Sequence, residues 1–268
     1  MFFLRGRLAD KAHGVLTWSG VALMIASFTW WQWTSQRQTS LAIPPSGTHE
    51  PFAVVVIDPG HGGQDSGAIV GGIVEKDLTL DIAQRVDRLL QGQGMATVMT
   101  RVGDGYVSLA ERAALTNRVP DCIMVSIHFN EGNKAVSSGI ETYYADHQVT
   151  AGTPIVSWLP FLQHTALQLP NPESQNLAGC VQEALVSHTQ AINRGTKAQQ
   201  FFVIANVRHP AVLVEGGFLT NKEETARLNN PDYREQIAGA ISDGIFHYRD
   251  LLRERRSAVA LGNTQGTE

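Results

Sequence analysis

The sequence contains an apolar run that leads directly into a glycine-rich turn, Val54-Val-Val-Ile-Asp-Pro-Gly-His-Gly-Gly-Gln-Asp-Ser-Gly67. Valine and isoleucine favour strands, and proline and glycine end them, so this stretch predicts a buried strand followed by a tight loop. The loop lacks the lysine of a phosphate-binding P-loop and the Gly-x-Gly-x-x-Gly spacing of a dinucleotide site. It presents His61 instead, either as a turn residue or as a metal ligand or catalytic base.

The opening pattern of strand and polar residue recurs further along the chain. Cys122–His128 is an apolar run that ends in a histidine, and Ala211–Gly217 is one that carries Glu215. Amphipathic helical spacing separates such runs, and further strands are predicted at shorter apolar segments. The helical segments are 74–91, 109–117, 176–191 and 233–252, and the further strands are 95–100, 139–144 and 201–204. Alternating strands and helices predict a single α/β domain with a mostly parallel, twisted sheet covered by helices on both faces.

Candidate functional residues gather at one edge of this predicted sheet. His61, His128 and Glu215 each follow or end a strand, and ligands bind at the carboxyl ends of parallel strands. Two histidines and a carboxylate, with one position left for water, form a usual ligand set for one catalytic Zn²⁺. Glu75 stands at the predicted helix start and can supply the carboxylate. Spacing alone leaves open which glutamate is ligand and which is base. Glu75 could also be a charge favoured by the helix dipole, and Glu215 a paired buried carboxylate.

The charge pattern of the N-terminal region predicts that the rest of the chain is exported from the cytoplasm. Residues 1–13 carry Arg5, Arg7 and Lys11, and residues 14–33 carry no formal charge and end in Trp30-Trp-Gln-Trp33. This pattern is typical of a membrane-spanning anchor whose basic flank stays in the cytoplasm. We favour an uncleaved anchor over a cleaved signal segment, and the third interpretation is a buried helix of the folded domain. Residues 34–50 are predicted to be a linker, 51–252 the catalytic domain, and 253–268 a polar, frayed tail.

The charge balance and the cysteine content indicate which partners and cross-links to expect. The 268-residue chain has a formal net charge of -4 and no basic stripe, so we expect no nucleic-acid partner. The two cysteines, Cys122 and Cys180, are too few for a disulfide scaffold. One bridge between them is possible in an oxidising compartment, but two buried free thiols are favoured.

Seven motifs occur in an order that resembles one family of cell-wall hydrolases. They are Asp58-Pro-Gly-His-Gly-Gly-x-Asp-x-Gly67, Glu75-Lys-Asp-Leu-x-Leu80, Thr100-Arg101, Ser126-Ile-His-x-Asn130, Gly139-Ile-Glu-Thr-Tyr-Tyr144, Arg194-Gly-x-Lys197 and Pro210-Ala-Val-Leu-Val-Glu-Gly-Gly-Phe-Leu-Thr-Asn221. Together they resemble the zinc-dependent N-acetylmuramoyl-L-alanine amidases of the division-amidase type, over about residues 52–252.

The resemblance implies roles for particular residues. His61, Glu75 and His128 match the zinc ligands, and Glu215 matches the catalytic glutamate. The implied reaction is hydrolysis of the amide between N-acetylmuramic acid and L-alanine in peptidoglycan, in wall remodelling or daughter-cell separation. The implied location is the cell envelope, periplasmic or extracytoplasmic. A zinc hydrolase of the same fold acting on another amide, and a wall-binding module without catalysis, are the alternatives.

Substrate contacts and regulation are predicted from the motifs and their departures. We predict contacts at Gly63, Asn130 and Phe129, where a bulky Phe129 replaces the family's usual small residue and would narrow the groove. Residues 145–175 form an insertion, and some relatives carry in this region a helix that covers the zinc until a partner removes it. Trp158 and Phe161 are the candidate lid residues, and an activator protein is the candidate partner. The alternative is a loop packed on the sheet edge.

Overall fold

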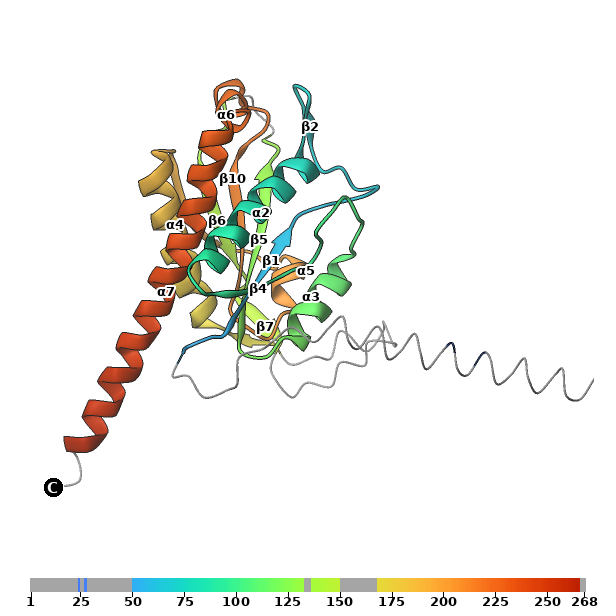
Figure 1. Ribbon diagram of the computed structural model, residues 1–268. Helices are drawn as coiled ribbons and strands as arrows, with labels where there is room; N and C mark the ends of the chain where they lie inside the picture. The colour runs from blue at the N-terminus through green and yellow to red at the C-terminus, as the bar shows by residue number, and fades with distance from the viewer. Residues whose placement is uncertain (1–23, 25–26, 28–49, 133–135, 150–167, 266–268) are drawn as a thin grey trace, which may run out of the picture. The chain divides into compact units, whose positions relative to one another are not determined.

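A computed structural model describes residues 24, 27, 50–132, 136–149 and 168–265 of the chain (Figure 1). The chain divides into two units, residues 1–46 and 47–268. In the first unit Met24 and Ser27 are helical, and the Ser27 hydroxyl donates to the Met24 carbonyl at 3.0 Å. The rest of the predicted anchor, and Trp158 and Phe161 of the insertion, lie outside the described residues. Among the residues that are described, none of the helices combines the length and apolar character needed to cross a bilayer.

The second unit is built on a six-stranded sheet with the order β4-β1-β5-β10-β6-β9. The strands are β1 Val54–Pro59, β4 Ala96–Met99, β5 Cys122–Asn130, β6 Ile140–Tyr144, β9 Asn193–Ala198 and β10 Ala211–Phe218. The first four in the sheet order pair in parallel, β6 pairs antiparallel with β10, and β9 pairs in parallel with β6. The predicted mostly parallel α/β sheet is confirmed.

Helices cover the two faces of the sheet over separate cores. One core packs β-strand residues such as Val55, Ile57 and Val125 against α2 Glu75–Gly92, α4 Pro172–Thr189 and α7 Pro231–Gln265. The other packs Val54, Val56 and Met124 against α3 Leu109–Arg118 and α5 Phe202–Ala205. Alternate strand residues therefore point to opposite faces of the sheet. Because both faces are covered by apolar cores, the strand sequences are continuous hydrophobic runs.

Small elements complete the described fold. The hairpin of β2 Ile69–Val70 and β3 Ile73–Val74 leads into α2, and α6 Lys222–Leu228 follows β10. β7 His147–Val149 and β8 Gln168–Pro170 pair antiparallel at the two ends of the predicted insertion. Asn171 then caps α4 by accepting from the Glu173 amide at 3.2 Å, so this helix begins inside the range predicted as insertion.

Several element predictions were wrong, each for an identifiable reason. Residues 202–205 form helix α5 and not a strand, because an unbroken apolar run has no period that separates the two. On the predicted helix 109–117, which the structure confirms as α3, Leu109 is 51% exposed and the charged Arg112 is buried. The polar edge strand β9 was missed because it has no apolar alternation.

The closing helix α7 runs to Gln265, past the Leu252 end that its apolar spacing predicted. Arginines hold the additional turns against the domain. Arg253 pairs with Glu50 at 2.5 Å, Arg255 pairs with Glu173 at 3.2 Å, and Arg256 donates to the Glu50 carbonyl at 3.2 Å. The start of the tail predicted as frayed is therefore helical.

Candidate metal centre

His61 stands on the glycine-rich loop that follows β1, in a backbone conformation that is uncommon for residues other than glycine. Its φ is +60°, in the left-handed region that L-residues rarely adopt. Two buried arginines hold the loop through its carbonyls. Arg112 donates to the His61 carbonyl at 2.5 Å and Arg101 to the Gly60 carbonyl at 2.8 Å. Asp65 Oδ1 lies 2.9 Å from His61 Nδ1, an ion-pair contact that lacks the geometry of a hydrogen bond.

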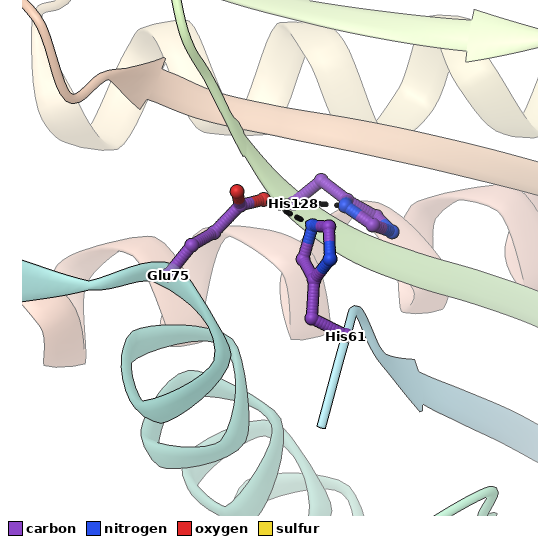
Figure 2. A group of neighbouring side chains, drawn as sticks. All are labelled: His61, Glu75 and His128. Atoms are coloured by element: carbon purple, nitrogen blue, oxygen red, sulfur yellow. Dashed lines mark hydrogen bonds and ion pairs between the residues drawn. The ribbon is translucent and has the colours of Figure 1, made fainter. Parts of the chain in front are cut away.

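Glu75 and His128 approach His61 from two other elements. Glu75 is the first residue of α2, and His128 lies near the carboxyl end of β5. Figure 2 shows the three side chains pointing toward one another. Glu75 Oε1 lies 3.0 Å from His61 Nε2 and 3.3 Å from His128 Nδ1, and one ligand atom from each residue fits within 4.8 Å.

Backbone amides and glycines fix this cluster from behind. The Phe129 amide donates to Glu75 Oε1 at 3.0 Å, and the Ala68 amide to Oε2 at 2.9 Å. A Cβ added to Gly60 would lie 2.4 Å from the His128 ring, and one added to Gly67 would lie 2.5 Å from Glu75 Oε2. These two glycines are thus needed so that the backbone can pass directly beside the ligand side chains.

The protonation equilibria of the three residues are strongly linked. Although burial opposes the charged forms, contacts with Glu75 and Asp65 raise the pKa of His61. Burial likewise opposes the charged form of Glu75, but hydrogen bonds with His128 and His61 lower its pKa. The carboxylate is therefore held ionised between two imidazoles, which suits it to share a cation with them.

Glu215 lies beside this cluster on β10. It is the register partner of His128 on β5 and of Glu141 on β6. Within the described part of the chain its Oε2 atom is buried without a hydrogen-bond partner. Burial first, and then the charges of Glu75 and Glu141, raise its pKa well above the ordinary value. A carboxyl group in this environment is poised to exchange a proton with whatever occupies the space beside it.

The predicted substrate residues have different surroundings. Phe129 is 2% exposed and packs in the core under Gly216, so the prediction that it narrows a groove is wrong. It is buried because β5 residues alternate and His128 takes the opposite face. Gly63 uses both backbone groups internally, donating to Asp104 at 2.8 Å and accepting from Lys76 at 2.9 Å. Asn130 donates to Glu141 at 2.9 Å.

Two histidine nitrogens and a carboxylate oxygen converge at the carboxyl edge of an α/β sheet, beside a half-buried glutamate whose Oε2 is buried. This arrangement defines the class of mononuclear metal-dependent hydrolases. Residues 55–247 match the profile of a protein family described as N-acetylmuramoyl-L-alanine amidase. The chain belongs to this family. The amidase resemblance of the sequence motifs is thereby confirmed, and the activity is hydrolysis of the amide between N-acetylmuramic acid and L-alanine in peptidoglycan.

The chain is similar to individual proteins over most of its length. The chain is 34% identical over 224 residues to the uncharacterized protein YqiI of Bacillus subtilis, covering 81% of this chain and 98% of that protein. It is 30% identical over 218 residues to the N-acetylmuramoyl-L-alanine amidase AmiA of Escherichia coli, covering 73% and 75%. The crystal structure of an N-acetylmuramoyl-L-alanine amidase from Clostridium difficile 630 superposes with a TM-score of 0.63 at 34% identity, over 75% of this chain and 98% of that one.

Sequence reasoning missed the residues that support the ligands. Arg112 belongs to none of the quoted motifs, and Arg101, Glu141, Arg194 and Lys197 belong to motifs but had no assigned role. These residues are charged, and charged residues usually lie at the surface, so the sequence did not indicate that Arg101, Arg112 and Glu141 are buried. The one available signal was Arg112 on the inward face of a short amphipathic helix, where a charge needs a partner.

Proposed function

We propose that this domain binds one Zn²⁺ through His61, Glu75 and His128 and that Glu215 acts as the general base and then the general acid of amide hydrolysis. The donor set suits zinc, since imidazole nitrogens favour it over Mg²⁺ or Ca²⁺. The observation that supports the role of Glu215 best is its place as register partner of His128, with a buried Oε2 that has no partner among the described residues.

When bound, zinc polarises a carbonyl oxygen and brings the pKa of a coordinated water toward neutrality. The protein residues supply the rest of the chemistry. Glu215 takes a proton from the attacking water and returns it to the alanine nitrogen as the C–N bond breaks. Asp65 lies beside His61 Nδ1 as a charge partner, and the amides of Ala68 and Phe129 keep the Glu75 carboxylate in place. Little reorganisation is then required when substrate arrives.

The decisive experiment is mass spectrometry of peptidoglycan digested by the full chain in detergent. Amidase action should leave intact stem peptides and glycan strands without peptide. Cleavage within the stem peptide would indicate a zinc hydrolase of other specificity. Wall binding without any new amino termini would indicate the non-catalytic module, and either result would overturn the proposal.

Two variants separate metal binding from turnover. Glu215→Ala should retain zinc and lose roughly 10²–10⁴-fold in activity, the usual contribution of a general base. His61→Ala should lose both zinc and activity. Zinc content by atomic absorption and turnover of purified wall measure the two properties independently. A Glu215→Ala protein with near-normal turnover would exclude the assigned role.

The substrate places the working enzyme outside the cytoplasm. We propose that residues 14–33 anchor it to the cytoplasmic membrane, with cleavage of a signal segment as the alternative. The support is the basic flank followed by a charge-free stretch in the sequence. Edman sequencing of the mature protein distinguishes the two, because a cleaved protein would begin after residue 33.

We also propose that residues 145–175 contain a lid that an activator protein removes. The support is the apolar run 155–162 with Trp158 and Phe161, which lies outside the described residues. Because Val149 is the register partner of Gln168, and Asn171 caps α4, residues 150–167 can be replaced by a two-residue turn without disturbing β8 or the helix. The shortened protein should hydrolyse purified wall faster. Equal or slower hydrolysis by a folded variant would contradict the lid.

A further inference from the structure

A charged cluster surrounds Glu141 at the start of β6, one strand away from Glu215. Glu141 is 2% exposed and is the register partner of Glu215. Its Oε1 accepts from Asn130 Nδ2 at 2.9 Å and from the Tyr143 hydroxyl at 2.7 Å. Its Oε2 accepts from Arg194 Nε at 2.7 Å and also from Lys197 Nζ. All the accepting capacity of this buried carboxylate is therefore used.

Two cationic side chains pair with the single carboxylate of Glu141. Arg194 and Lys197 share Glu141 as their one ion-pair partner among the described residues, and the nearby carboxyl groups of Glu215 and Glu224 both have a pKa raised by burial. The two cationic side chains are 35% and 40% exposed, whereas the Glu141 side chain is 2% exposed. The two cations are thus partly open to solvent, while the carboxylate that they share is buried beneath them.

The geometry of the two cations is fixed in advance of any ligand. The Arg194 guanidinium lies 4.8 Å from the centre of the Phe218 ring, and Lys197 Nζ lies 5.7 Å from the centre of the Tyr143 ring. Bonds to Glu141 and to the Ser138 carbonyl occupy only part of the five N–H donors of Arg194. Donors therefore remain for an anion that arrives from solvent.

The cationic pair lies in line with the metal centre. His128, Glu215 and Glu141 are register partners on β5, β10 and β6, and Lys197 on β9 is the partner of Tyr143, which shares the face of Glu141. Strands are about 4.8 Å apart, so β9 lies roughly 10 Å from Glu215. Two residues of an extended peptide bound at the metal centre would span about 7 Å. Because the side chains of Arg194 and Lys197 reach back from β9 toward Glu141, this span brings the second residue within their range.

We propose that Arg194 and Lys197 form a subsite that binds the free carboxylate of the stem-peptide residue following L-alanine. Arginine and lysine bind carboxylates through charge-assisted hydrogen bonds, and a residue at this position has the required reach. Glu141 acts as the positioning residue that holds both cations. The inference rests on the proposed amidase function and adds a preference for an acidic second residue.

The test compares two muropeptides that differ only at the second stem residue, one with a free α-carboxylate and one with that group amidated. Wild-type full-length chain in detergent should cleave the free form with kcat/KM about tenfold higher, since a hydrogen bond to a charged group contributes that order of discrimination. Lys197→Met and Arg194→Gln should each abolish most of this preference by raising KM for the free form alone. kcat should stay unchanged.

Arg88→Gln is the matched control, because Arg88 is an exposed arginine on α2, which packs on the opposite face of the sheet. It should leave the preference intact. Equal losses on both substrates in the Arg194 and Lys197 variants would mean a structural role only and would overturn the subsite. A wild type that cleaves both muropeptides equally would also overturn it while leaving the amidase function standing. A wild type that cleaves neither would refute the amidase function and this inference with it.

Discussion

Arg112 contacts the backbone of the metal-binding loop and the carboxylate at its base. Its side chain is 3% exposed, pairs with Asp58 at 2.6 Å, and donates to the carbonyls of Pro59 and His61 at 2.6 and 2.5 Å. His61 has a left-handed backbone that costs free energy, and residues in such conformations persist only where their surroundings hold them. Arg112 supplies that support for His61.

We expect Arg112→Met to destabilise the folded protein by about 3–5 kcal/mol, because it leaves the Asp58 carboxylate buried with neutral donors only. The affinity for zinc should fall as well, since the His61 carbonyl loses its donor. Urea unfolding in the presence of a chelator measures the first effect, and competition with a chromophoric chelator measures the second.

Arg118→Met provides the control for this change. Arg118 lies on the same helix, is exposed, and contacts only the Ala114 carbonyl of its own helix among the described residues. The replacement should alter stability by less than about 0.5 kcal/mol. If the two variants unfold at the same urea concentration, Arg112 does not support the loop.

The metal ligands were predictable from sequence at the residue level, whereas their supports were not. His61 and His128 follow strand patterns, and strand ends in a parallel sheet share an edge, so local signals were sufficient for the two histidines. The choice of Glu75 over Glu215 as the third ligand came from the family resemblance and not from spacing. Arg112 contacts Asp58 across 54 positions of sequence. The inward position of Arg112 on an amphipathic helix indicates that the charge has a partner, but no local pattern identifies Asp58 as that partner.

At the scale of elements, the loop from Gly60 to Gly67 must pass close behind the ligand rings. Gly60 has an ordinary backbone conformation, so an added methyl group would act through contact with His128 and not through backbone strain. We expect Gly60→Ala to displace the His128 ring and lower the affinity for zinc at least tenfold. The stability of the metal-free, chelator-treated protein should change less. Competition with a chromophoric chelator measures the affinity.

Gly92→Ala is the matched control, because a Cβ at Gly92 meets nothing within 4 Å. It should leave zinc affinity unchanged and raise helix stability slightly, by about 0.5–1 kcal/mol. Wild-type zinc affinity in Gly60→Ala would show that the loop can move away from His128.

Elements with a clear apolar period were predicted well, and those without one were not. α2 and α7 have wide apolar faces against the sheet, so their existence followed from spacing. β9 is an edge strand whose residues are half-buried or exposed, and its pairing with β6 depends on the distant sheet and not on its own sequence. α5 is a short apolar run for which helix and strand are equivalent patterns.

At the scale of the whole domain, the sheet separates two apolar cores, and each core contains one cysteine. Cys122 lies in the core beneath α3 and α5, and Cys180 lies on α4 in the core on the other face. Both are free thiols, as favoured by the sequence, and the intervening sheet prevents their sulfur atoms from meeting.

Burial in these cores controls the chemistry of both thiols. Burial, and then the charge of Asp121, raises the pKa of Cys122 to about 12, and burial also raises the pKa of Cys180. An unfolded thiol ionises near pH 8.5, so the stabilising contribution of Cys122 is fully present below that pH and is lost as pH rises toward 12. Near pH 8 the native protein should therefore hold both thiols protonated and shielded.

We expect no reaction with Ellman's reagent in native buffer and reaction of both thiols in denaturing guanidinium. A Cys180→Ala chain, which keeps only Cys122, should react once and only when unfolded. Rapid labelling of the native chain, or a mass showing an intramolecular disulfide, would mean that the two cores are not separated by the sheet as described.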